Sequence, residues 1–185
     1  MALTVLTGGA RSGKSAAAVV AATTSGAPVT FIATAERGDD EMAERIARHR
    51  AERPAHWTTV EAPHDLAGAV TEVDPAETII VDCLAIWVTN RMLAEPRPGD
   101  ADIQEEAARL ADELAARPGQ ALVVTNEVGS GVVPATPLGR DFRDLLGLIN
   151  QAIVRAADRA YLVVAGRLLP LVDPADGLGP KGRGE

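Results

Sequence analysis

The chain has 185 residues and a formal net charge of −8 at neutral pH. This length suits one domain, which can bury about 70% of the surface that the unfolded chain exposes. The acidic balance argues against nucleic acid or an anionic membrane as the main partner, because both attract basic surfaces. A single cysteine, Cys83, allows no internal disulfide, and no apolar run approaches the roughly 18 residues of a membrane-spanning helix. We expect a cytoplasmic protein without membrane insertion.

Short apolar runs alternate along the chain with stretches of helical pattern. Strands are expected, in chain order, at Leu3–Thr7, Val29–Thr34, Thr78–Cys83, Ala121–Thr125 and Ala160–Val164. Helices are expected between them at Lys14–Thr24, Asp40–Arg53, His64–Val73, Ile103–Arg117 and Leu138–Asp158. Strands that are apolar on both faces are typical of a parallel sheet covered by helices on both sides. The pattern therefore predicts a three-layer α/β domain with a mainly parallel central sheet.

Three other segments complete this outline. Trp57–Glu61 favours a short extra strand, because it is rich in threonine and valine. Arg91–Asp100 contains prolines and a glycine and is expected to be a mobile surface loop. We expect one catalytic domain over residues 1–170 and a flexible tail over 171–185, where glycine, proline and charge dominate.

The most specific motif is the run Gly8–Ser15, which fits the pattern G-x-x-x-x-G-K-[ST] at every defined position. It lies between the first predicted strand and the first predicted helix, as in P-loop NTPases. The glycines allow backbone N–H groups to face an anion, Lys14 can reach the outer phosphates, and the Ser15 hydroxyl can hold Mg²⁺. The motif predicts a P-loop NTPase-like fold that binds a nucleoside triphosphate. Its candidate contacts are Gly8, Gly9, Ala10, Arg11, Ser12, Gly13, Lys14 and Ser15.

The ends of the other predicted strands carry further candidates, because ligands of open α/β sheets bind beyond the carboxyl ends of the strands. The second strand leads into Ala33-Thr34-Ala35, small residues beside which a nucleotide can lie. The third strand closes on Asp82, for which we favour support of Mg²⁺ over a helix-capping role. The fourth leads into Thr125–Gly131, which fits a substrate loop and an ordinary turn equally well.

Among the three histidines, His49 has the most unusual surroundings. It lies on the apolar face of the helix predicted at 40–53. Three arginines surround it: Arg45, Arg50 and Arg53. Such a group suits an anion better than simple packing, yet the residues alone leave both a structural and a catalytic role open. The other two histidines fit ordinary surface roles: His56 and His64.

A series of motifs occurs in order along the chain. They are Thr7–Ser15, Asp40-Glu41-Met42, Arg45-Ile46 with His49, Arg53–Trp57, Asp82-Cys83, Val88-Thr89-Asn90, Val124–Gly129, Gly131–Pro134 and Phe142-Arg143-Asp144. Together they resemble the bifunctional adenosylcobinamide kinase/adenosylcobinamide-phosphate guanylyltransferases of cobalamin biosynthesis. The resemblance spans roughly Leu3 to Gly166 and is far more specific than the glycine-rich motif alone.

The resemblance implies two reactions: phosphorylation of the aminopropanol hydroxyl of adenosylcobinamide, and transfer of GMP from GTP to that phosphate. It implies ATP and GTP as substrates, a homotrimer, and a histidine that carries GMP. The matching histidine is His49, and Lys14 is the second catalytic candidate. The family's nucleotide contacts correspond to the glycine-rich motif and to Ala33, Thr34, Ala35, Arg50, Ala51, Glu52, Arg53, Glu61 and Asp82.

Two other classes of protein remain as alternatives. A P-loop kinase of small alcohols, without nucleotidyl transfer, would use Lys14, Ser15 and Asp82 but would give His49 no task. A non-catalytic, nucleotide-gated binding protein would explain the glycine-rich motif but not the arginines around His49. We favour the bifunctional enzyme because it accounts for both groups of residues.

Overall fold

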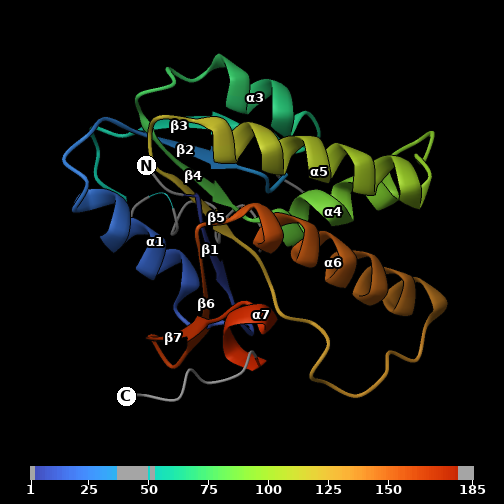
Figure 1. Ribbon diagram of the computed structural model, residues 1–185. Coiled ribbons are helices and arrows are strands. Elements are labelled where there is room, and N and C mark those ends of the chain that lie inside the picture. Colours follow the sequence, from blue (N-terminus) through green and yellow to red (C-terminus); the bar gives the residue numbers. More distant parts are fainter. Residues whose placement is uncertain (1–2, 37–49, 51–52, 179–185) are drawn as a thin grey trace, which may run out of the picture.

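The computed structural model describes residues 3–36, 50 and 53–178, and the structural statements below concern this part of the chain. One seven-stranded sheet runs through it, in the order β3-β2-β4-β5-β1-β6-β7 (Figure 1). All neighbouring strands in this part pair in parallel except β6 and β7. The predicted, mainly parallel sheet is confirmed. The strands are β1 (Leu3–Thr7), β2 (Val29–Ala33), β3 (Thr58–Glu61), β4 (Thr78–Asp82), β5 (Ala121–Val124), β6 (Arg159–Val164) and β7 (Arg167–Leu171).

Helices flank the sheet on both sides. They are α1 (Lys14–Thr23), α3 (Leu66–Glu72), α4 (Leu84–Leu93), α5 (Asp100–Ala116), α6 (Pro137–Ala156) and α7 (Pro174–Leu178). Figure 1 shows α1 apart from the group formed by α3, α4, α5 and α6, whose members contact one another. None of the helices in the described residues is long and apolar enough to cross a membrane.

The core is formed by the central strands and the apolar stripes of two long helices. Every residue of β1 and β5 is buried, as expected of strands covered on both faces. α5 and α6 each bury residues three or four positions apart, the spacing that brings side chains to one face of a helix. This packing fixes the carboxyl ends of the central strands. The stripes are Ile103, Ala107, Leu110 and Leu114 in α5 and Leu146, Ile149 and Ile153 in α6.

The region after β4 departs from the prediction. Arg91–Asp100 was expected to be a surface loop; residues 94–99 do connect two helices, but Arg91 lies in α4 and Asp100 begins α5. α4 begins with the uninterrupted apolar run Leu84–Val88, so it lacks the spacing of three or four residues that would have indicated a helix. The start of α5 is fixed by the Asp102 carboxylate, which accepts a hydrogen bond from the backbone N–H of Gly99 at 3.0 Å.

The C-terminal elements also go beyond the prediction. β7 is an exposed edge strand that contains Pro170, a residue tolerated at a sheet edge because no neighbouring strand needs its missing N–H. The sequence of β7 shows no alternation of apolar and polar residues that would have predicted a strand. α7 forms within the segment expected to be a flexible tail, although it buries no residue. The helix predicted at 40–53 lies outside the described residues, apart from Arg50 and Arg53.

Candidate active site

The loop between β1 and α1 folds so closely that two of its positions require glycine. Gly8 is buried with a φ of 153°, and a Cβ there would collide with the backbone oxygen of Val163 in β6. Gly13 has a φ of 98°, and a Cβ there would lie 3.1 Å from the Cα of Gly166. Residues other than glycine rarely adopt such backbone conformations. The two glycines that define the motif are therefore explained by the backbone of this loop.

Two segments distant in sequence hold the loop in place. The N–H of Gly166, in the turn between β6 and β7, donates to the carbonyl oxygen of Ser12 at 2.8 Å. The N–H of Glu127, just after β5, donates to the carbonyl oxygen of Gly8 at 3.1 Å. The sequence alone indicates no such role for either residue. A glycine after Ala165 could have indicated a turn, but no local pattern predicts which loop that turn contacts.

Polar groups suited to an anion gather in this loop. The side chain of Lys14 is buried, and its Nζ donates to the carbonyl oxygen of Gly9 at 2.8 Å. The Ser12 hydroxyl is buried without a hydrogen-bond partner among the described residues. α1 begins directly at Lys14, which adds the partial positive charge of a helix N-terminus. An ammonium group, a helix N-terminus and an unsatisfied hydroxyl at one place are chemically suited to phosphate.

The carboxyl ends of β3, β2 and β4 form a row beside this loop. Ala33 is paired with Glu61 on one side and with Asp82 on the other. β1, β5 and β4 run in the same direction, so the start of α1 with Ser15, which follows β1, lies at the same edge of the sheet as Asp82. A hydroxyl and a carboxylate suit Mg²⁺, which typically takes its remaining ligands from phosphates and water. No group of three or more histidine, cysteine or acidic side chains suited to a metal occurs among the described residues.

Thr34 locks the ends of β2 and β4 together. Its buried hydroxyl donates to the carbonyl oxygen of Cys83 at 2.7 Å and accepts from the Cys83 N–H at 2.9 Å. The Asn90 side chain in α4 donates to the carbonyl oxygens of Thr34 at 2.8 Å and Pro63 at 3.0 Å. Asn90 belongs to one of the quoted motifs but had been given no role. These bonds hold the backbone at the centre of the candidate nucleotide site.

Cys83 is a structural residue in this arrangement. Burial, with a smaller contribution from the Asp82 charge, raises the pKa of its thiol to about 11. Because only the thiolate is strongly nucleophilic, a thiol that stays protonated at neutral pH is poorly suited to attack a phosphate.

The remaining predicted residues lie near the outer strands or outside the described chain. The Arg53 guanidinium lies over the Phe31 ring, 3.3 Å from its centroid, which places Arg53 against β2. Glu61 is exposed at the end of β3, and Arg50 is exposed as well. Ala35 is half-buried. His49, Ala51 and Glu52 lie outside the described residues.

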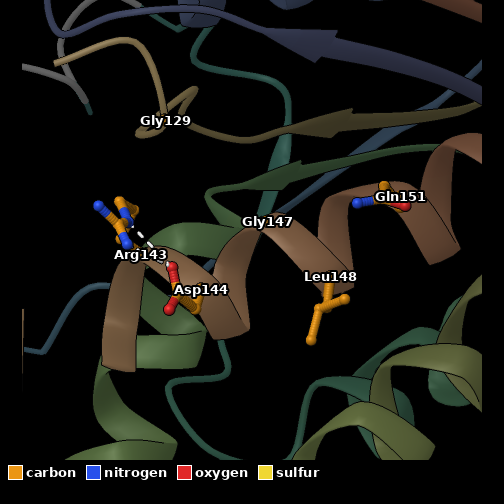
Figure 2. A pocket seen from close by; sticks show the side chains of 6 residues that line it. All are labelled: Gly129, Arg143, Asp144, Gly147, Leu148 and Gln151. Atoms are coloured by element: carbon orange, nitrogen blue, oxygen red, sulfur yellow. Dashed lines mark hydrogen bonds and ion pairs between the residues drawn. The ribbon is translucent and has the colours of Figure 1, made fainter. Parts of the chain in front are cut away.

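An open hollow is present beside the segment that follows β5. It has a volume of about 440 Å³ and lies between Gly129 and one face of α6 (Figure 2). The sequence left the segment Thr125–Gly131 undecided between a substrate loop and a turn. Its lining residues are Gly129, Arg143, Asp144, Gly147, Leu148 and Gln151.

Comparison with known proteins assigns the chain to a family. The model of the family described as cobinamide kinase / cobinamide phosphate guanyltransferase matches residues 4–171. The chain belongs to this family. Its relatives include the bifunctional adenosylcobalamin biosynthesis protein CobP of Pseudomonas aeruginosa, 45% identical over 168 residues that cover 90% of this chain and 95% of the relative. The proteins named CobU of Escherichia coli and Salmonella typhimurium are 40% and 41% identical, each covering 88% of this chain and 95% of the relative.

Membership in the cobinamide kinase / cobinamide phosphate guanyltransferase family establishes the class of enzyme. The chain is a transferase of cobalamin biosynthesis that acts on cobinamide and on nucleotides. The resemblance inferred from the motifs is thus confirmed, as is the P-loop-like α/β fold. The candidate site must accommodate two kinds of ligand, a nucleotide and a much larger corrinoid alcohol.

Proposed function

We propose that this chain phosphorylates the aminopropanol hydroxyl of adenosylcobinamide and then transfers GMP from GTP to the new phosphate. The products of the second step are adenosylcobinamide-GDP and pyrophosphate. The observation that carries this proposal is the loop of Gly8–Ser15. Its buried Lys14 and the Ser12 hydroxyl, which has no hydrogen-bond partner among the described residues, can both donate hydrogen bonds to a phosphate group. The names of the relatives, which refer to adenosylcobalamin, support the adenosylated form of the substrate.

One nucleotide site serves ATP and GTP in this proposal. Lys14 offsets charge on the outer phosphates, and Ser15 and Asp82 would hold Mg²⁺, which supplies further neutralisation of phosphate charge when bound. The Glu61 carboxylate would accept hydrogen bonds from the guanine edge. The other proposed contacts are Gly8 to Ser12, Gly13, Ala33, Thr34, Ala35, Arg50, Ala51, Glu52 and Arg53.

The guanylyl transfer passes through a GMP adduct on His49. A neutral imidazole nitrogen attacks the α-phosphorus of GTP, a nitrogen–phosphorus bond forms, and the bond to pyrophosphate breaks. The phosphate of adenosylcobinamide phosphate then attacks the same phosphorus, and the imidazole leaves with its electron pair. Arg50 and Arg53 are close to His49 in sequence and would offset the negative charge in transit.

Labelling with GTP tests this step. Enzyme incubated with α-labelled GTP should retain label on the protein, whereas γ-labelled GTP should leave none by this route. The bond to histidine is a phosphoramidate, so the label should be lost in mild acid and persist in alkali. His49→Ala should abolish labelling while still binding the triphosphate. Acid-stable label, or full labelling of the variant, would mean that another residue is the nucleophile, with His56 as the next candidate.

The same labelling experiment distinguishes the proposed function from the alternative one. A P-loop kinase of small molecules, without nucleotidyl transfer, would use the same loop and would turn over γ-phosphate without retaining guanylyl label. We further propose that the enzyme is a cytoplasmic homotrimer with no nucleic-acid partner. Light scattering after size exclusion tests the trimer, since a mass near that of one chain would contradict it.

A further inference from the structure

The hollow beside α6 lies at the same edge of the sheet as the glycine-rich loop. Glu127 donates its backbone N–H to Gly8, and Gly129, two residues later, lines the hollow. Asn150 of α6 accepts from the Thr125 hydroxyl at 2.7 Å and donates to the carbonyl oxygen of Asn126 at 3.0 Å. The hollow therefore has a fixed position next to the candidate nucleotide site.

Gly147 keeps this hollow open. A glycine inside a helix costs about 1 kcal/mol relative to alanine, so its presence calls for a reason. A Cβ at Gly147 would meet no atom within 4 Å, so the packing of the protein does not require glycine there. Figure 2 shows Gly147 between Asp144 and Leu148 on the face of α6 that lines the hollow. The missing side chain leaves space that is open to a ligand.

The lining combines an apolar surface with groups that can form hydrogen bonds to uncharged amides. The Arg143 guanidinium is 2.8 Å from the Asp144 carboxylate, so the pair adds no net charge that would favour a second nucleotide. The Leu148 side chain is 50% exposed and offers an apolar surface. The Gln151 side chain and the backbone of Gly129 add hydrogen-bonding groups.

We propose that this hollow is the acceptor site, in which one edge of the corrinoid ring lies against Gly147 and Leu148. This inference rests on the proposed function, which supplies the acceptor. A corrinoid is a broad macrocycle with amide arms on its rim, and such arms suit Gln151 and the paired Arg143 and Asp144. A volume of about 440 Å³ is within the range of ligand sites, and it fits an edge of the macrocycle rather than the whole.

Gly147→Leu tests the proposal because its Cβ would meet no atom of the protein within 4 Å and the rest of its side chain would reduce the space in the hollow. Leucine favours helices, so the variant should fold, which thermal unfolding checks. The KM for adenosylcobinamide should rise at least tenfold, while the KM for GTP in protein labelling without acceptor stays within twofold. Gly147→Ala should give a smaller rise in the corrinoid KM. Ala108→Leu adds the same side chain to the exposed surface of α5 and should change neither value.

Gln151→Leu provides a second test that does not depend on Gly147. It removes the amide and should raise the corrinoid KM about threefold, the loss expected for one hydrogen bond. An unchanged corrinoid KM in both variants, with normal GTP labelling, would overturn the acceptor site. An equal rise in the KM for GTP would overturn it too, because the hollow would then serve the nucleotide. Absence of labelling in the unmodified enzyme would instead contradict the proposed histidine intermediate.

Discussion

Two neighbouring strands, β1 and β5, lead into segments of opposite character. The loop after β1 is tightly held: Gly8 has no space for a side chain, and Lys14 is buried. The segment after β5 is open, because a Cβ at Gly131 would meet nothing within 4 Å and Val132 is 97% exposed. A close, polar loop suits a ligand of small and constant shape such as phosphate. An open segment beside a hollow suits a large ligand that the protein contacts along one edge.

Removing the ammonium group of the closed loop should have the largest effect. Lys14→Ala should lower turnover in both reactions about a hundredfold, since a charged phosphate contact contributes on the order of 3 kcal/mol in the transition state. Arg140→Ala is the matched control beside the open segment, where this guanidinium donates to the carbonyl oxygens of Pro134 and Ala135. It should change nucleotide turnover less than threefold. Near-normal turnover by Lys14→Ala in both assays would refute a shared nucleotide site.

The closed loop was predictable because its signals are local. Gly8, Gly13 and Lys14 lie within seven residues, and their spacing alone predicts a tight loop that carries a lysine. The contacts that support the loop come from Gly166 and Glu127, more than a hundred residues away in the chain. No pattern within a segment contains that information, because it depends on the order of the strands in the sheet.

The elements of the fold that the sequence did not predict also lacked a local signal. α4 was not predicted because its apolar residues run without interruption from Leu84 to Val88 instead of recurring at helical spacing. β7 was not predicted because it is exposed throughout and contains Pro170, a residue that is unfavourable within a strand. The hollow depends on one face of α6 meeting the segment after β5, although the glycine at position 147, inside a predicted helix, was a signal that could have indicated it.

A matched pair of glycine substitutions should sharpen the contrast between the two segments. Gly8→Ala forces a side chain against the Val163 carbonyl in a conformation that costs about 1–3 kcal/mol, and Tm should fall by roughly 2–12 °C. Gly131→Ala meets open space and should change the free energy of unfolding by less than about 0.5 kcal/mol. Thermal unfolding of both variants measures the difference. Equal Tm values would mean that the loop after β1 relaxes as easily as the open segment.

A smaller effect is expected from two carboxylates, one at the end of β4 and one just after β5. Asp82→Asn should lower activity about tenfold at limiting Mg²⁺ and recover much of it at raised Mg²⁺, because a neutral amide is a weaker ligand for the ion. Glu127→Gln is the matched control, since the Glu127 carboxylate accepts the backbone N–H groups of Gly129 at 2.6 Å and Ser130 at 3.0 Å, and an amide oxygen can accept both. The Mg²⁺ concentration required for half-maximal activity should therefore rise for Asp82→Asn alone. An unshifted titration for a well-folded Asp82→Asn would contradict the proposed metal role of Asp82. A shift for Glu127→Gln as well would mean that the segment after β5 also affects the metal, and the division between a closed nucleotide loop and an open acceptor segment would fail.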